Sequence, residues 1–193
     1  VPTHAHLGFR CHGQGRGVHW GYVTNGVNAI ESAAQRIGFV GDIEDRLAAT
    51  EVRDYGFSVP YSTLSTGVIR GGIAANVIPK DCEVQFDMRT LPSASAAALY
   101  AELCDYAKKL EAEMRSADAV AKIEMTWESS TEGLVENEND AIVKLAQQIA
   151  RNTTVGKVSN SPEAGMFQQN GIPTVICCPG DLAQGHAPDA LVT

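Results

Sequence analysis

The sequence predicts an α+β fold, and three observations carry this prediction. Strands and helices alternate over the first two thirds of the chain, in the order strand, helix, strand, strand, helix, strand. Residues 82–89 alternate strictly between apolar and polar side chains, which is typical of a half-buried strand. After residue 132 the composition becomes polar and acidic, which indicates a linker to a second region.

The first half of the chain predicts a strand, one or two helices and a second strand, in that order. Residues 7–14 predict a strand that ends in a run of glycines. Asn25 is a candidate N-cap for a helix whose apolar residues recur at helical spacing up to a stop at Gly38. A second helical or irregular stretch covers residues 42–53, and residues 62–69 predict another strand that Gly71 and Gly72 terminate.

The next elements complete one compact unit. On residues 82–89 one face is apolar, and the other places Asp87 and Arg89 on the same side of the strand. Pro92 and Ser93 begin a long helix with apolar residues three and four positions apart up to Met114, and residues 121–127 predict a further strand. This order is the split βαβ arrangement, called ferredoxin-like, and we expect it to form a domain over residues 7–129.

Residues 130–193 are expected to be the closing segment of an α/β layer. After the linker at 132–140, residues 142–149 predict a helix and residues 155–158 a short strand. The pair Ser161 and Pro162 predicts a helix start, and Asn170 with Gly171 predicts its end. The apolar run at 173–178 suits a buried parallel strand.

Composition limits the classes of function. The 193 residues carry a formal net charge of −8, so a nucleic-acid partner is not expected. There is no apolar run long enough to cross a membrane and no secretory signal, so we expect a cytoplasmic protein without a membrane partner. The five cysteines are odd in number and lack C-x-x-C spacing, which favours reduced, mostly buried thiols over disulfides or a zinc ribbon.

Several polar residues stand where they could serve chemistry, each with a plainer alternative. His19 follows a glycine-rich approach, and it is either a ligand-facing residue or a solvated surface histidine. Arg89 could bind a carboxylate through its guanidinium group or pair with Asp87. Asn76 could offer an amide to a ligand or serve as a turn residue.

Three further groups concern the ends of the chain. Glu163 stands near a helix N-terminus, which stabilises an acid with or without a function. His186 follows the expected last strand, where open α/β sheets place their sites, and is a candidate zinc ligand or a loop residue. His4 and His6 could bind adventitious metal, but we expect a frayed N-terminal end there.

Read together, these positions resemble one superfamily. The motif pairs are Gly17-Val18-His19 with Gly26-Val27-Asn28-Ala29-Ile30, Gly71-Gly72-x-x-x-Asn76-x-x-Pro79 with Asp87-x-Arg89, and Glu163-Ala164-Gly165-x-Phe167 with Pro179-Gly180 through His186-x-Pro188-Asp189. In this order they resemble the zinc-dependent amidohydrolases of the aminoacylase, carboxypeptidase and succinyl-diaminopimelate desuccinylase type, and among these the acetylornithine deacetylases.

The resemblance implies a lid domain, a mechanism and roles for residues. Such enzymes hold two zinc or cobalt ions in an α/β catalytic domain, where a bridging hydroxide attacks an amide carbonyl. The ferredoxin-like lid forms a homodimer, and its histidine, here His19, hydrogen-bonds the developing oxyanion in the partner's site. Asn76 and Arg89 would bind the carboxylate end of an N-acyl amino acid, Glu163 would line the site near the substrate amine, and His186 would be a metal ligand.

The resemblance also implies what this chain needs for activity. The superfamily's other metal ligands and its catalytic glutamates precede the lid, and no such segment stands in these 193 residues. We therefore expect a fragment of an amidohydrolase that is inactive alone and that requires the N-terminal metal-binding part as a partner. The alternative is a non-catalytic dimerisation or small-ligand-binding module derived from the lid.

Overall fold

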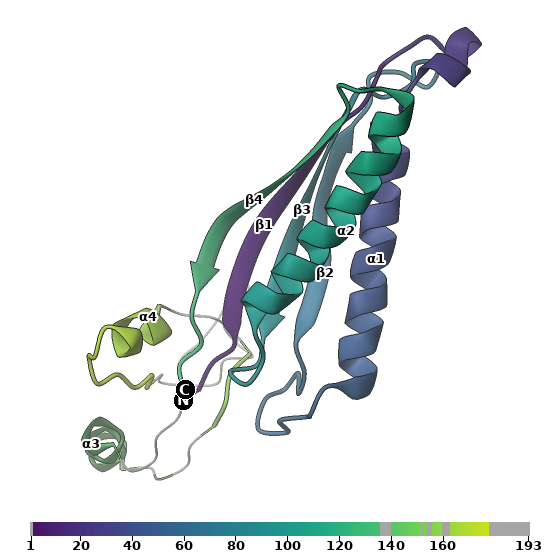
Figure 1. Ribbon diagram of the computed structural model, residues 1–193. Coiled ribbons are helices and arrows are strands. Elements are labelled where there is room, and N and C mark those ends of the chain that lie inside the picture. Colours follow the sequence, from purple (N-terminus) through teal and green to yellow (C-terminus); the bar gives the residue numbers. More distant parts are fainter. Residues whose placement is uncertain (1, 136–139, 152, 154–155, 160–162, 178–193) are drawn as a thin grey trace, which may run out of the picture.

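The core of the molecule is an antiparallel sheet covered on one face by two long helices (Figure 1). The structure is a computed structural model that describes residues 2–135, 140–151, 153, 156–159 and 163–177. The sheet has the order β2-β3-β1-β4, and all neighbouring strands run antiparallel. This is the topology of the split βαβ arrangement, and it confirms the α+β fold.

Seven elements form this part of the chain, which we call the sheet unit (residues 5–131). The strands are β1 (Ala5–Gln14), β2 (Thr63–Gly71), β3 (Asp81–Thr90) and β4 (Lys122–Thr131), and the long helices are α1 (Ala29–Thr50) and α2 (Ala96–Ala117). A short 3-10 helix, η1 (Trp20–Asn25), precedes α1. The predicted strands at 82–89 and 121–127 and the predicted long helix are all confirmed, with bounds shifted by a few residues.

The apolar face of the sheet explains why the helices pack there. Alternate residues of β1 and β3 are buried against α1 and α2, while their neighbours point to the other side. Phe9 lies at the centre, with its ring stacked on Phe86 at 4.9 Å and edge-on to Tyr100 at 5.4 Å between centroids. The hydrophobic cluster continues into the inward sides of both helices, where Ile43, Leu103 and Leu110 are buried.

Helix α1 differs from the prediction at both ends. Its N-cap is Asn28, whose side chain accepts hydrogen bonds from the backbone N–H groups of Ile30 and Glu31, so Asn25 is not the cap. The predicted stop at Gly38 is wrong, because the helix runs on to Thr50 and buries Val40 and Ile43. A glycine inside a helix costs about 1 kcal/mol, which is less than the gain from burying two such side chains.

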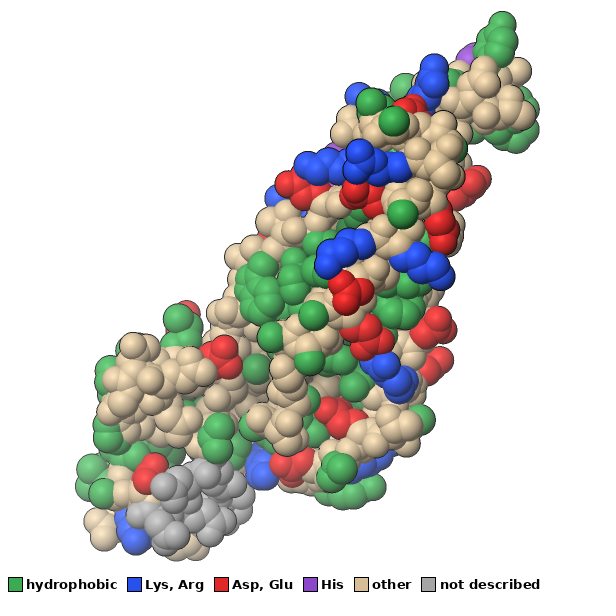
Figure 2. Space-filling model, in the orientation of Figure 1, with side chains coloured by type: hydrophobic (Ala, Val, Ile, Leu, Met, Phe, Trp, Pro, Cys, Tyr) green, Lys and Arg blue, Asp and Glu red, His purple; other side chains and the backbone are tan. Residues whose placement is uncertain are grey.

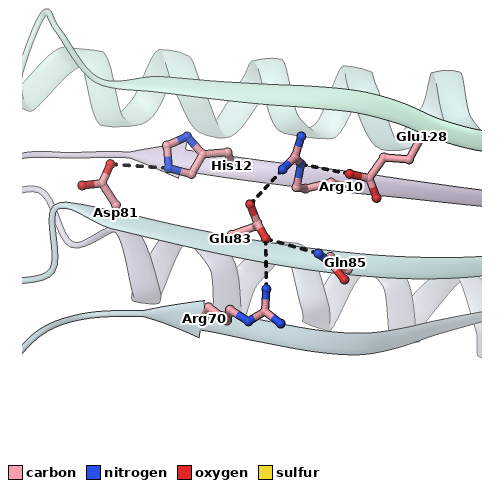
Figure 3. A network of polar contacts seen from close by, with 7 residues as sticks. All are labelled: Arg10, His12, Arg70, Asp81, Glu83, Gln85 and Glu128. Carbon is pink, nitrogen blue, oxygen red and sulfur yellow. Dashed lines mark hydrogen bonds and ion pairs between the residues drawn. The ribbon is translucent and has the colours of Figure 1, made fainter.

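The opposite face of the sheet is polar. Its side chains pair with one another across the strands, as Figure 3 shows for β1, β2, β3 and β4. Arg10 contacts Glu83 and Glu128, each at 3.2 Å, and Arg70 approaches the same Glu83 at 3.9 Å. None of the described helices covers this face, so the network is solvated.

The chain enters and leaves the sheet unit at one place. The backbone N–H of Thr3 donates to the carbonyl of Leu134 at 3.1 Å, and the N–H of Leu134 donates to the Thr3 hydroxyl at 2.9 Å. His4 is buried here, with its ring tilted against Phe57 at 4.4 Å. The expected frayed end is therefore wrong for His4 and His6, because β1 and this joint fix both residues.

The part after the sheet unit, which we call the C-terminal segment (residues 140–177 as described), has helices without a core. Helix α3 (Ala141–Ala150) confirms the expected helix, and α4 (Ala164–Gln169) ends at Asn170, before Gly171 with its φ of +76°. The expected helix start at 161–162 lies outside the described residues. Residues 173–177 form no strand, so that prediction is wrong for them.

Two smaller predictions concern strands and cysteines. Where a strand was expected at 155–158, the described residues form one parallel bridge, between Val158 and Thr3. The four described cysteines are free: Cys11 and Cys82 are buried, Cys104 is half-buried and Cys177 is exposed. Burial raises the pKa of the Cys11 thiol to about 11, so this thiol is not reactive. None of the described helices is both long and apolar enough to span a membrane.

Candidate functional site

His19 lies at one end of the sheet unit, on a fixed turn. This end, which we call the tip (residues 17–26 and 72–80), joins β1 to α1 and β2 to β3. The Nδ1 atom of His19 accepts a hydrogen bond from the backbone N–H of Gly21 at 3.2 Å. A neutral imidazole that accepts at Nδ1 carries its hydrogen on Nε2, so the exposed nitrogen of His19 is a hydrogen-bond donor.

Backbone pairing brings Asn76 to the same place. Residues His19 and Val77 form an antiparallel bridge, and the carbonyl of Asn76 accepts from the Trp20 N–H at 3.0 Å. Asn76 itself stands in an exposed turn, as its plainer alternative predicted, and its side chain is open to solvent. The tip therefore holds two polar side chains that the sequence placed more than fifty residues apart.

A hollow lies beside His19 at the tip. Its volume is about 890 Å³, and it is lined by His12, Val18, His19, Arg70, Ile73 and Asp81 among others. His12 Nε2 lies 3.4 Å from a carboxylate oxygen of Asp81, and both belong to the polar face of the sheet (Figure 3). The hollow thus combines an imidazole donor, an arginine and apolar walls.

Arg89 lies at the opposite end, which we call the base (residues 2–4, 51–62, 89–91 and 132–135). Its Nε donates to Asp87 Oδ1 at 3.0 Å, which confirms the pairing named as its plainer alternative. A second nitrogen, Nη1, donates to the backbone carbonyl of Ser159 at 3.4 Å. Arg89 is eight residues along β3 from Asp81, so it lies about 27 Å from the tip along the strand.

The base is also where the sheet unit meets the C-terminal segment. Lys157 pairs with Asp54 at 2.8 Å, and this hydrogen bond holds the pKa of Asp54 below its usual value. Burial lowers the pKa of His4, and the nearby Arg89 lowers it further, while Glu51 and Asp54 act in the opposite direction. The hydroxyl groups of Ser58 and Ser159 lie 3.0 Å apart.

The remaining candidates are less defined. Glu163 is exposed at the N-terminal end of α4, and its side chain makes no capping hydrogen bond. His186 lies outside the described residues. Within the described ranges, no three His, Cys, Asp or Glu side chains come close enough to hold a metal ion, so these residues do not form a metal centre. The structure therefore joins His19 to Asn76 and separates both from Arg89.

The polar neighbours of these residues could not be identified from the sequence alone. His12, Arg70 and Asp81 border the hollow beside His19, and His6 Nε2 lies 2.8 Å from Asp87 next to Arg89. Polar residues alternate with apolar residues on β1 as they do on β3. This alternation is the signal in the sequence that could have identified the polar side of β1. Which of them face each other depends on the strand register, in which His6 stands opposite Arg89 and His12 opposite Glu83.

Comparison with known proteins gives one family match and several longer relatives. Residues 3–115 match the family described as peptidase dimerisation domain. The chain is 30% identical over 202 residues to the acetylornithine deacetylase of Shigella sonnei, covering 97% of this chain and 48% of the relative. The acetylornithine deacetylase of Aliivibrio fischeri is 30% identical over 178 residues, with 91% and 44% covered. The chain spans about half the length of these curated relatives.

Solved structures share the fold at lower identity. An aminopeptidase from Bacillus cereus superposes with a TM-score of 0.69 at 18% identity, over 93% of this chain and 45% of that chain. An amidase of the hydantoinase/carbamoylase family from Burkholderia vietnamiensis gives a TM-score of 0.63 at 15% identity, over 85% and 37%. At these identities the similarity shows a shared fold and does not indicate a substrate.

Proposed function

The chain belongs to the peptidase dimerisation domain family, and from this premise we propose that it is part of a metal-dependent amidohydrolase. The sheet unit would be the lid and dimerisation domain of that enzyme. The C-terminal segment would be the closing part of its catalytic domain. The reaction would remove an N-acyl group from an amino acid by hydrolysis of a linear amide bond.

N-acetylornithine is the first substrate to test, with ornithine and acetate as products in arginine biosynthesis. The support is that two relatives at 30% identity carry the name acetylornithine deacetylase. We keep a cytoplasmic location as part of this proposal. The alternative, a non-catalytic dimerisation or ligand-binding module, predicts no turnover by any protein that contains the chain.

The single observation that carries the proposal is the state of the His19 ring. Because Gly21 donates to Nδ1, the exposed Nε2–H is free to donate a hydrogen bond to a substrate. During hydrolysis of an amide, negative charge develops on the carbonyl oxygen, and a fixed donor aimed at that oxygen lowers the barrier. Asn76, held beside His19 through its backbone, would bind another polar atom of the substrate.

The separation of tip and base explains why a dimer would be needed. Arg89 lies about 27 Å along β3 from the tip that holds His19 in one protomer, which is too far for one small substrate. Strand β2 is an edge of the sheet, and it carries no charged side chain before Arg70. Antiparallel pairing of two β2 strands would bring the tip of one protomer toward the base of the other, so the partner's His19 would complete the site.

The metal belongs to the rest of the proposed enzyme. Two zinc or cobalt ions would activate the attacking water there. The described residues do not supply a ligand set, and His186 stays a predicted ligand. We therefore expect the 193 residues alone to be inactive, and the partner they require is the metal-binding part that the resemblance implies.

The proposal is tested by mixing two variants of a full-length protein that contains this chain. His19→Ala should lower kcat roughly 100- to 1,000-fold, as removal of an oxyanion donor does in other hydrolases. Arg89→Ala should raise KM. If His19 acts across the dimer, mixed dimers of the two variants hold one intact site and regain activity.

Three outcomes decide between the hypotheses. Recovery of activity on mixing supports the proposal, and no recovery assigns His19 to its own protomer. The matched control is His6→Ala, which removes a histidine of β1 that contacts Asp87 far from the tip and should not imitate the loss seen with His19→Ala. If the wild-type protein hydrolyses no N-acyl amino acid with zinc or cobalt present, the amidohydrolase proposal is wrong.

The proposed dimer interface has its own test. A side chain at Gly67, in the middle of β2, would meet no atom closer than the Gln85 carbonyl at 3.9 Å. Gly67→Glu is therefore compatible with the protomer, but it places two carboxylates together when two β2 strands pair at their centres. Sedimentation should show monomers for Gly67→Glu and dimers for Gly156→Glu, a control in open space. Dimers of both variants would exclude this edge.

A further inference from the structure

The tip carries an aromatic turn that the proposed chemistry does not use. In η1, Trp20 is 62% exposed and Tyr22 is 66% exposed, and the nearby Ile73 is 88% exposed. Figure 2 shows separate hydrophobic side chains at this end of the molecule, among polar and backbone atoms. Exposed apolar side chains that cluster beside a functional group point to a binding surface.

The backbone holds this turn in place. The Trp20 N–H donates to the Asn76 carbonyl at 3.0 Å, the Tyr22 N–H donates to the His19 carbonyl at 2.8 Å, and the Gly26 N–H donates to Val23 at 3.0 Å. Trp20 is thus joined to both polar residues of the candidate site. In a dimer that places His19 in the partner's site, the indole ring of Trp20 lies beside that site as well.

Trp20 borders a hollow of its own. Its volume is about 580 Å³, and its apolar lining includes Trp20, Ile30, Ile73, Ala74 and Val77. The hollow beside His19 shares Ile73 and Val77 with it, so the two adjoin across the β2–β3 loop. The hollow beside His19 therefore offers an N–H donor for a carbonyl oxygen, and the hollow beside Trp20 offers an apolar wall.

We propose that Trp20 and Ile73 form an acyl-group subsite that favours N-acyl amino acids with an aromatic or longer aliphatic acyl chain. This rests on the proposed function. The carbonyl oxygen that His19 would bind belongs to the acyl group, so the acyl chain starts one bond from the carbon that carries this oxygen and lies within reach of the apolar hollow that adjoins His19. A methyl group, as in an acetyl substrate, would fill little of the hollow, whereas a phenyl ring or a hexanoyl chain would be removed from water against the indole.

The test compares acyl groups on one amino acid in the full-length protein. The kcat/KM ratio of the N-benzoyl to the N-acetyl substrate is measured for the wild type and for Trp20→Ser. Serine keeps the backbone N–H that donates to Asn76, so His19 stays in place. The ratio should fall roughly 10- to 100-fold, the range in which apolar pocket contacts discriminate substrates.

A matched variant separates the subsite from a general effect. Tyr22→Ser removes an equally exposed aromatic ring from the same turn, but Tyr22 does not line either hollow. We expect this variant to leave the benzoyl-to-acetyl ratio as it is in the wild type. Equal loss on all acyl groups in Trp20→Ser would overturn the proposal, because Trp20 would then contact protein and not the acyl chain.

Fluorescence gives a second readout that does not depend on turnover. Trp127→Phe leaves Trp20 as the one tryptophan of these 193 residues, and the difference between this variant and one that also carries Trp20→Phe isolates its emission in the full-length protein. That emission should shift to shorter wavelength as N-benzoyl amino acid saturates the protein. An unchanged spectrum at saturating substrate would also overturn the proposal. Turnover of no N-acyl substrate would instead refute the proposed function, and the subsite with it, so the two failures are distinguishable.

Discussion

The sheet unit and the C-terminal segment contrast in how they treat apolar side chains. In the sheet unit the strands and both long helices bury a continuous core around Phe9. In the C-terminal segment, α3 buries none of its residues, although it is the most amphipathic helix described, and Leu145 and Ile149 are exposed. The first region can fold through its own contacts, and the second presents an apolar face that requires another surface.

The largest effect should follow from opening the core of the sheet unit. Phe9 is completely buried, and its ring contacts Phe86 and Tyr100. Phe9→Ala should lower the free energy of unfolding by about 3–5 kcal/mol, because it removes buried area and leaves a cavity. Urea denaturation followed by circular dichroism measures this loss. A loss below about 1 kcal/mol would mean that the unit does not depend on this core.

A second change should stabilise the same region. Arg36 is 4% exposed on α1, and its Nη1 donates to the Ser32 hydroxyl, but its Nε and Nη2 have no hydrogen-bond partner among the described residues. None of the acidic side chains described forms an ion pair with it. A buried unpaired charge is costly, so Arg36→Met should raise the free energy of unfolding by about 1–3 kcal/mol. A lower denaturation midpoint would contradict this reading.

Removal of a helix cap in the sheet unit should have a smaller effect. Asn28 caps α1 with hydrogen bonds of 3.0 and 3.2 Å to Ile30 and Glu31. Asn28→Ala should lower the thermal midpoint by an amount equivalent to about 1 kcal/mol, whereas Asn28→Asp keeps an acceptor oxygen and should retain most of the stability. Equal losses in both variants would show that the cap itself is not responsible.

The joint between the two regions should respond to pH. Burial lowers the pKa of His4 in the folded chain, so the unfolded chain binds a proton more readily than the folded one. Stability should therefore decrease as the pH falls below the unfolded value of 6.5, and it should level off below the folded pKa. His4→Phe, which keeps a ring against Phe57, should remove this dependence from chemical denaturation curves. The decrease persisting in His4→Phe would assign it to other groups.

The smallest effect is expected in the C-terminal segment. Ile149 is 76% exposed on α3, so Ile149→Ala should change the free energy of unfolding of the 193-residue chain by less than about 0.5 kcal/mol. A loss as large as that of a core substitution would show that α3 has a partner surface within this chain. Comparison of Ile149→Ala with Phe9→Ala measures the contrast between the two regions directly.

The same contrast explains how far the sequence could be interpreted. The alternation on β3 and the apolar spacing on α2 identified these elements, because both elements pack their apolar side chains at the same face of the sheet. The strand expected at 173–178 failed for its described residues, since a parallel strand is defined by its neighbour and none of the described strands provides one. The length of α1 also escaped prediction, because burial of Ile43 outweighs the local cost of Gly38.

Candidate site residues were easier to name than to place. His19 and Asn76 were selected separately, and only the pairing of two loops brings them together. Pairing of Arg89 with Asp87 could be predicted from side-chain direction, because residues two apart on a strand point the same way. The observed contact between the two side chains agrees with this prediction. The roles of Glu163 and His186 remain predictions.

The joint at Thr3 and Leu134 brings the two ends of the sheet unit together. The residues that flank the unit, Thr3 and Leu134, are joined by hydrogen bonds of 3.1 and 2.9 Å, so the chain enters and leaves the unit at one place. A unit of this kind can be exchanged between host proteins by replacing one surface loop, without stretching the host backbone.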